Sequence, residues 1–198
     1  WGQDWFPGLD AVVAYGLVRV VKPVTIIEVG SGHSTRFLVR AINDENIKSN
    51  VVCIDPEPRA ALHGLDINFI RIPLQKVDLK GLPVLRKGDI LFIDSSHIGV
   101  PGSDVDIIVS SILPMLPPGV FIHFHDIFLP DPYPKNWEWR EYNEQLIISA
   151  LLAGKKFNPI FSSYFIRNYA PEHLRELGFD WIQVLPGSIE SSLWLETR

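Results

Sequence analysis

The stretch Ile26–Asp55 decides the fold, and it begins Ile26-Ile27-Glu28-Val29-Gly30-Ser31-Gly32-His33-Ser34-Thr35. A β-branched run stops at two glycines, and a helical pattern of apolar residues then runs through Phe37, Leu38, Val39 and Ile42. A second apolar run, residues 51–54, ends on Asp55. This order predicts a strand, a glycine turn, a helix and a second strand closed by an acid, the arrangement that holds a ribose-bearing cofactor.

The two glycines and the acid have separate predicted tasks. Gly30 and Gly32 let the backbone turn tightly and approach a ligand without a Cβ in the way. Asp55 lies 25 residues after Gly30, where an acid at the end of the second strand accepts hydrogen bonds from ribose hydroxyls. The dinucleotide fingerprint needs a third glycine where this chain has Thr35. That substitution argues against a nicotinamide cofactor.

The pattern Glu28-x-Gly30-x-Gly32, with Asp55 in register, resembles motif I of the class I S-adenosylmethionine (SAM) methyltransferases. The resemblance implies SAM as the cofactor. It also implies a set of cofactor-binding residues around the turn and at two strand ends: Glu28, Gly30, Ser31, Gly32, His33, Ser34, Asp55 and Asp94.

A second group of polar residues follows two later apolar runs. Residues 89–94 end on Asp94, with His97 three positions on, and residues 120–125 end on His125-Asp126. Ligands bind at the carboxyl ends of parallel strands, and adjacent strands lie about 4.8 Å apart, so we expect these side chains to converge. Two carboxylates and an imidazole suit a divalent cation with open positions, and His97 can reach the same pocket.

These segments, Phe92-Ile93-Asp94-Ser95-Ser96-His97 and Gly119-Val120-Phe121-Ile122-His123-Phe124-His125-Asp126, resemble the metal-dependent O-methyltransferases of sugars and related natural products. The resemblance implies methyl transfer from SAM to a hydroxyl oxygen of a small-molecule acceptor. It implies Asp94, His125 and Asp126 as ligands of Mg²⁺ or another divalent cation, and His97 as general base beside Asp94 in the catalytic site. The chain departs from the family at His125, a position that is commonly acidic, because imidazole is a softer ligand than magnesium prefers.

The composition limits the class of protein. The chain has 198 residues, of which 46% are hydrophobic and 21% charged, an ordinary globular mixture for one domain. The net charge of −5, without a long basic run, disfavours nucleic acid and anionic membranes as partners. The single Cys53 excludes an intramolecular disulfide. With no signal-like segment and no apolar run of membrane-spanning length, we expect a cytoplasmic protein, with oligomerisation left open.

Strands that alternate with helices predict an α/β fold with right-handed crossovers. We expect a single-domain, Rossmann-like methyltransferase fold over residues 1–198: a mainly parallel sheet, helices on both faces and a C-terminal antiparallel strand pair. Asp10 is expected to cap the first helix. Three further expectations concern residue ranges: a short helix near Arg59–Leu62, a helical segment over Asp104–Leu116, and late strands over Phe157–Phe165 and Ser192–Glu196 around a helix near Glu172–Leu177.

The aromatic, proline-containing insertion Asp131–Tyr142 follows Asp126 directly. A cluster of this kind is commonly a packed surface loop. Its position after the proposed site favours a lid or an acceptor-binding wall.

Two other functions stay open. A metal-dependent hydrolase or hydroxylase would use His123-x-His125-Asp126 and a transition metal, although a third cluster of His or Cys is missing. For His123 itself a buried structural role is favoured, because buried histidines are usually hydrogen-bonded core groups. A non-catalytic methyltransferase-like domain would bind cofactor, or a partner, without turnover.

Overall fold

The computed structural model describes residues 3–198 and leaves Trp1 and Gly2, the first residues of the predicted domain, outside the described part. Within it, seven strands form one sheet in the order β3-β2-β1-β4-β5-β7-β6. The strands are β1 (Thr25–Val29), β2 (Asn50–Ile54), β3 (Asn68–Ile70), β4 (Ile90–Ile93), β5 (Phe121–Phe124), β6 (Phe157–Ser162) and β7 (Leu193–Thr197). Neighbours from β3 to β5 are parallel, whereas β7 runs antiparallel to both β5 and β6. The predicted fold class and the C-terminal antiparallel pair are confirmed.

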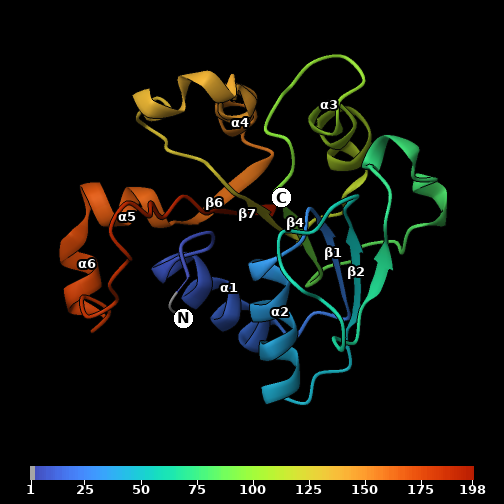
Figure 1. Cartoon of the computed structure of the whole chain (residues 1–198), viewed down its shortest axis with the longest axis horizontal. Coiled ribbons are helices and arrows are strands. Elements are labelled where there is room, and N and C mark those ends of the chain that lie inside the picture. Colours follow the sequence, from blue (N-terminus) through green and yellow to red (C-terminus); the bar gives the residue numbers. More distant parts are fainter. Residues whose placement is uncertain (1–2) are drawn as a thin grey trace.

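Helices cover both faces of the sheet, which explains why the central strands are continuous apolar runs. The α-helices are α1 (Gly8–Val21), α2 (His33–Asp44), α3 (Asp104–Ile107), α4 (Glu144–Ala153), α5 (Ser163–Tyr169) and α6 (Pro171–Glu176). A π-helix η3 (Ile108–Ile112) continues α3, and 3-10 turns are η1 (Leu74–Lys76), η2 (Leu79–Gly81), η4 (Leu113–Met115) and η5 (Lys135–Arg140). Figure 1 shows α1 and α2 on one side of the sheet and α3 and α4 on the other.

The side-chain alternation of the strands divides the core into two layers. Ile26 and Phe92 pack with Leu38 of α2 on one face. Ile27 and Leu91, one position along, pack on the opposite face with residues of η3 and α4. All five residues of β1 are buried, so this strand holds the first glycine turn in a fixed place.

Several local expectations were wrong in detail. The expected strand over Phe157–Phe165 ends at Ser162, and α5 begins at the next residue. No helix forms near Arg59–Leu62, a segment of bends and turns. Asp10 does not cap α1, because the helix starts at Gly8 and the Asp10 side chain is fully buried against the C-terminal part of the chain. In contrast, the expected helical segment over Asp104–Leu116 is confirmed, since this range contains α3, η3 and η4.

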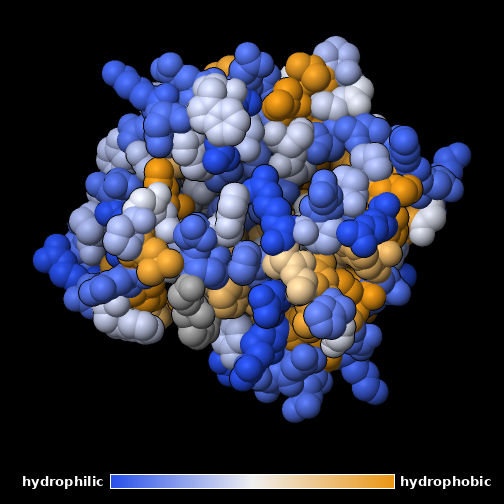
Figure 2. Space-filling model, viewed as in Figure 1, coloured by the Kyte–Doolittle hydropathy of each residue, from blue (hydrophilic) through white to orange (hydrophobic). Residues whose placement is uncertain are grey.

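The surface is mixed in character. On the face shown in Figure 2, hydrophilic residues surround separate apolar patches. Among residues 3–198, no helix is long and apolar enough to cross a membrane.

Candidate active site

The predicted site residues gather at the carboxyl edge of the parallel strands. The strand order reverses between β1 and β4, which pair in register from Ile26 with Ile90 to Val29 with Ile93. Such a switch point is where open α/β sheets bind their ligands. β5 lies next to β4, and the backbone N–H of His125 donates to the carbonyl of Ile93. The sequence-based prediction that β4 and β5 bring their polar ends together is confirmed.

The backbone around Gly30 leaves no room for a side chain at this position. It has a positive φ of 92°, and a Cβ there would collide with the carbonyl oxygen of Asp94. A Cβ at Gly32 would meet no atom closer than 3.7 Å, the Cβ of Arg59. The missing side chain at Gly30 therefore lets the end of β4 approach the end of β1, a reason that the sequence did not reveal.

Glu28 fixes the turn from inside. Its side chain is buried, and its two oxygens accept hydrogen bonds from Ser34 Oγ at 2.6 Å and Thr35 Oγ1 at 2.7 Å. Thr35 also accepts a hydrogen bond from the N–H of Gly32 at 3.0 Å. Burial raises the pKa of Glu28 to about 7, although the hydrogen bonds from Ser34, Thr35 and Cys53 act in the opposite direction. Thr35, which stands where a third glycine would be, thus joins the turn to Glu28.

Asp55 lies at the end of β2, facing a cavity of about 290 Å³. One carboxylate oxygen accepts from Ser31 Oγ at 2.9 Å, and the other accepts from the backbone N–H of Glu57 at 2.7 Å. These bonds fix the carboxylate, and each oxygen keeps a lone pair for a further donor. The same cavity is lined by Gly30 and by Asp94.

A second cavity, of about 310 Å³, adjoins the first, because Ser31, Arg59 and Asp94 line both. It lies over the glycine turn and brings together the remaining predicted contacts: Gly32, His33, Ser34, His125 and Asp126. Of the predicted cofactor-binding residues, only Glu28 lines neither cavity.

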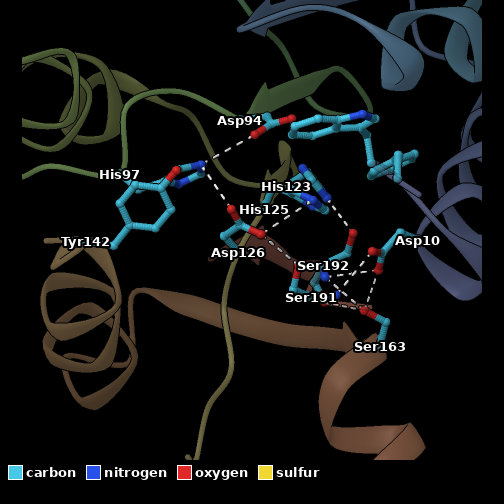
Figure 3. A network of polar contacts seen from close by, with 12 residues as sticks. Asp10, Asp94, His97, His123, His125, Asp126, Tyr142, Ser163, Ser191 and Ser192 are labelled. Carbon is cyan, nitrogen blue, oxygen red and sulfur yellow. Dashed lines mark hydrogen bonds and ion pairs between the residues drawn. The ribbon is translucent and has the colours of Figure 1, made fainter. Parts of the chain in front are cut away.

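His97 contacts three carboxylates, and Figure 3 shows two of them, Asp94 and Asp126, joined to it by dashed lines. Its Nε2 lies 3.4 Å from Asp94 Oδ1 and 3.5 Å from Asp126 Oδ2, and its Nδ1 lies 2.9 Å from Glu144 Oε2. His97 and Glu144 are buried, whereas the Asp94 side chain is 31% exposed. Glu144 therefore holds the ring from behind while Nε2 points to the two carboxylates that face the cavity. Its contact with His97 joins α4 to the site.

The contacts within this cluster shift the pKa values of His97 and Asp94 in opposite directions. Burial opposes a charge on His97, but Asp94, Glu144 and Asp126 together raise the pKa of His97 well above its ordinary value. Burial raises the pKa of Asp94, but the charges of His125 and His97 outweigh this effect, so the pKa of Asp94 is below its ordinary value. The neighbouring carboxylates therefore favour the charged form of the ring, with a proton on both nitrogens.

Two of these residues adopt unusual backbone conformations. His97 has φ of 59° and Asp126 has φ of 55°. A left-handed conformation at a residue other than glycine costs of order 1–3 kcal/mol, and such residues gather at functional sites. Both residues lie in the segments that follow β4 and β5, and their side chains approach each other to 3.5 Å.

Beneath the site lies a buried network that the sequence did not predict. The Asp10 carboxylate accepts from the backbone N–H groups of Ser191 and Ser192 at 3.1 and 3.0 Å and from the hydroxyl of Ser163. Ser191 Oγ then donates to Asp126 Oδ1 at 3.0 Å. Figure 3 shows these residues side by side. The N-terminal helix, α5 and the C-terminal segment therefore hold Asp126 in position.

The predicted metal ligands Asp94, His125 and Asp126 lie near one another and contact imidazole rings. Asp94 and Asp126 both face His97 Nε2, and His125 Nε2 lies 3.6 Å from Asp126 Oδ1. Among the described residues, no three His, Cys, Asp or Glu side chains are placed to hold a metal ion together. The carboxylates of Asp94 and Asp126 are paired with imidazole rings instead. Imidazole nitrogen is also a softer ligand than magnesium prefers. The ligand set Asp94, His125 and Asp126 stays a prediction.

His123 has a structural role. It is fully buried, its Nε2 lies 2.8 Å from Ser192 Oγ, and its ring stacks on Phe92 with centroids 3.7 Å apart. Burial, with the charge of His125, lowers the pKa of His123 well below its ordinary value. The His123-x-His125-Asp126 set of a hydrolase or hydroxylase therefore lacks its first ligand.

The insertion after Asp126 forms one wall of the larger cavity through Trp137 and Arg140 of η5. Tyr142 packs against His97, with ring centroids 4.7 Å apart (Figure 3). Two further segments, residues 4–6 and 186–189, also line this cavity. The sequence did not reveal these two walls, because neither segment carries a motif.

Several solved structures of methyltransferases have a fold similar to that of this chain. The chain resembles the methyltransferase PaMTH1 of Podospora anserina, solved with S-adenosylhomocysteine (SAH), at 18% identity and a TM-score of 0.60, covering 96% of this chain and 78% of that one. It resembles the O-methyltransferase TomG of Streptomyces achromogenes, involved in tomaymycin synthesis and solved with SAM, at 15% identity and a TM-score of 0.57, covering 94% and 78%. A structure described as CmcI-D160 with Mg and SAM matches at 18% identity and a TM-score of 0.52, covering 75% and 62%.

A search of curated proteins gave no match. The model of a family described as a methyltransferase domain matches residues 27–127, more than half of the chain, from within β1 to the residue after Asp126. The prediction of a SAM-dependent methyltransferase is thus confirmed at the level of the family: this chain belongs to the methyltransferase domain family.

Proposed function

We propose that this domain transfers the methyl group of SAM to a hydroxyl oxygen of a small molecule, such as a sugar or a natural product. The observation that supports this best is the shared edge of two cavities. The smaller one contains Asp55, the larger one contains Asp126, and Asp94 lines both. The nucleoside part of SAM in the smaller cavity and the acceptor molecule in the larger one can therefore meet beside the Asp94 carboxylate.

The smaller cavity suits the nucleoside. The Asp55 carboxylate is held by Ser31 and by the N–H of Glu57, and its remaining lone pairs suit the two hydroxyls of a ribose. The turn Gly30–Gly32 and the start of α2 supply the next part of the binding surface.

SAM supplies a methyl group on a positively charged sulfur, which keeps the electron pair of the broken C–S bond while the acceptor oxygen forms the new C–O bond and gives up its proton. His97 Nε2 is the nitrogen that faces the larger cavity's carboxylates, so it is the proposed acceptor of that proton. Glu144 fixes the opposite side of the ring through Nδ1.

The ring can accept this proton only when Nε2 is free of its own. Its raised pKa therefore makes turnover rise with pH. A cationic cosubstrate in the cavity beside Asp94 opposes the charge on His97 and shifts the ring toward the neutral form. Much of the acceleration would come from holding oxygen, methyl carbon and sulfur in line.

The proposed transfer uses no metal, because no three His, Cys, Asp or Glu side chains of the described residues are placed to hold one together. TomG and the Mg–SAM structure of CmcI give the precedent for O-methyl transfer and for a metal in proteins of this fold.

Calorimetric titration of SAM and SAH tests the proposal, with wild-type protein and the variants Asp55→Ala and Asp66→Ala. We expect affinity in the micromolar range for both ligands, weakened at least about tenfold in Asp55→Ala, which loses the carboxylate for the ribose. Asp66 does not line either cavity and serves as the matched control. Absence of binding, or equal affinity in Asp55→Ala, would overturn the nucleoside assignment.

A further inference from the structure

The insertion places an unpaired arginine in the wall of the larger cavity. Arg140 lies in η5 and lines the cavity together with Asp94 and Asp126. Three other arginines of the described chain form ion pairs, Arg19 with Glu45, Arg40 with Asp44 and Arg167 with Glu190, whereas Arg140 and Arg59 in this cavity wall form none. No carboxylate of residues 3–198 lies within ion-pair distance of Arg140.

Aromatic rings fix the guanidinium of Arg140. Its central carbon lies 4.1 Å from the ring centroid of Trp137 and 5.4 Å from that of Tyr142. Nη1 donates to Tyr142 Oη at 3.1 Å, whereas Nε is buried without a hydrogen-bond partner among the described residues. Stacking on the rings fixes the plane of the guanidinium, a group whose N–H donors match carboxylate and phosphate oxygens with two parallel hydrogen bonds.

The cavity's own carboxylates do not serve as partners of Arg140. Asp94 and Asp126 are in contact with His97, and Asp126 also accepts from Ser191. A half-buried guanidinium with an unsatisfied N–H carries a desolvation cost that a bound anion removes. Arg59, stacked on Trp5 at 4.7 Å, lines the same cavity and adds a second positive charge.

We propose that the methyl acceptor carries an anionic group, a carboxylate or a phosphate, which Arg140 binds while the acceptor hydroxyl lies near Asp94 and His97. This inference rests on the proposed function and adds the chemical class of the acceptor. Trp137 and Tyr142 hold the arginine in place, so the insertion selects the acceptor as well as closing the cavity wall.

Nuclear magnetic resonance of the arginine Nε–H groups tests the inference on the full chain with SAH present. The Arg140 signal is identified by its loss in Arg140→Lys. The probes are D-glucuronate for a carboxylate, D-glucose 6-phosphate for a phosphate and D-glucose as the neutral counterpart. We expect at least one anion to shift the Arg140 signal saturably, with an affinity at least about tenfold above that for glucose. The comparison of the two anions identifies which group is preferred.

Arg140→Gln and Arg86→Gln form a matched pair, because both remove one positive charge and Arg86 lies outside the cavity wall. For these variants, anion binding is followed by the indole N–H signal of Trp137, assigned with Trp137→Phe. Arg140→Gln should reduce the preference for the anion to about twofold or less, whereas Arg86→Gln should keep it. The inference is wrong if neither anion shifts the Arg140 signal up to about 10 mM, where millimolar binding is visible, or if the preference survives in Arg140→Gln.

SAH calorimetry on the same variants separates this inference from the proposed function. SAH binding that stays within about threefold of wild type in Arg140→Gln supports an acceptor role. A loss of about tenfold or more would mean that Arg140 binds the carboxylate of the cosubstrate, and would overturn the acceptor assignment. Failure of the wild-type protein to bind SAH would count against the proposed function, whatever the result with the anions.

Discussion

The glycine turn and the His97 cluster lie at the same edge of the sheet, but they satisfy their buried charges differently. In the turn, the Glu28 carboxylate is enclosed by the hydroxyls of Ser34 and Thr35, which lie six and seven residues away in the sequence. In the cluster, His97 meets Asp126 and Glu144, which come from other elements. Hydroxyl groups carry no charge, so they offset only part of the effect of burial, which raises the pKa of the Glu28 carboxyl group. The opposite charges in the cluster instead favour the ionised forms of both the imidazole and the carboxylates. The first arrangement builds a rigid support, and the second builds a group that can exchange a proton.

The largest expected effect is loss of turnover when the cluster loses its imidazole. His97→Gln keeps a side-chain N–H for Glu144 but removes the proton acceptor, so we expect turnover to fall by at least about a hundredfold. SAH affinity should stay within about threefold, because His97 lines neither cavity. Methyl-transfer rates across pH, with an anionic acceptor identified by screening, provide the measurement.

His63→Gln is the matched control, because His63 is exposed. The rise of wild-type activity with pH should persist in His63→Gln and vanish in His97→Gln. Unaltered turnover or an unaltered pH profile in His97→Gln would remove His97 from the reaction and leave it a structural role.

A second effect, on stability, tests the turn. The pKa of Glu28 rises from an ordinary 4.5 to about 7 in the folded chain. Between these pH values the folded state binds more protons than the unfolded state, so the contribution of Glu28 to stability is full below pH 4.5 and is lost as pH rises through about 7. The loss amounts to roughly 3 kcal/mol.

Urea unfolding of wild type and Glu28→Gln between these pH values measures this effect. Glu28→Gln keeps an oxygen for Ser34 or Thr35 but cannot ionise, so its stability should fall less with pH than that of wild type. Glu57→Gln, at an exposed site, should follow wild type. Parallel curves for wild type and Glu28→Gln would show that the turn does not hold a protonated carboxyl group.

The smallest expected effect concerns the metal. The imidazole ring of His97 already pairs with the carboxylates of Asp94 and Asp126. We therefore expect the SAH affinity and the turnover measured with EDTA to stay within about twofold of those measured with magnesium. Calorimetry and methyl-transfer assays with each addition provide the readouts. A loss of activity that magnesium restores would contradict this expectation, and would favour Asp94, His125 and Asp126 as ligands after His97 moves away.

The sequence predicted the local parts well because their causes are local. The run from Ile26 to Asp55 contains the strand, the turn and the acid in order, and all three lie where the pattern placed them. Strand-end residues such as Asp94 and Asp126 were also found, since parallel strands end at one edge. By contrast, the expected strand through Phe165 was interrupted because Ser162 caps a new helix by accepting from the N–H of Phe165.

Sequence by itself determined the order of strands and helices, the glycine turn and the group of site residues, because apolar periodicity and turn chemistry act over short distances. Only the tertiary structure decided what each polar group faces. Asp10 and Ser191 are 181 residues apart and yet share a hydrogen bond. The pKa of His97 depends on Glu144, which reaches it from α4. Contacts of this kind follow from how the layers pack, and electrostatic energies depend on distance and burial in space, which the linear pattern does not contain.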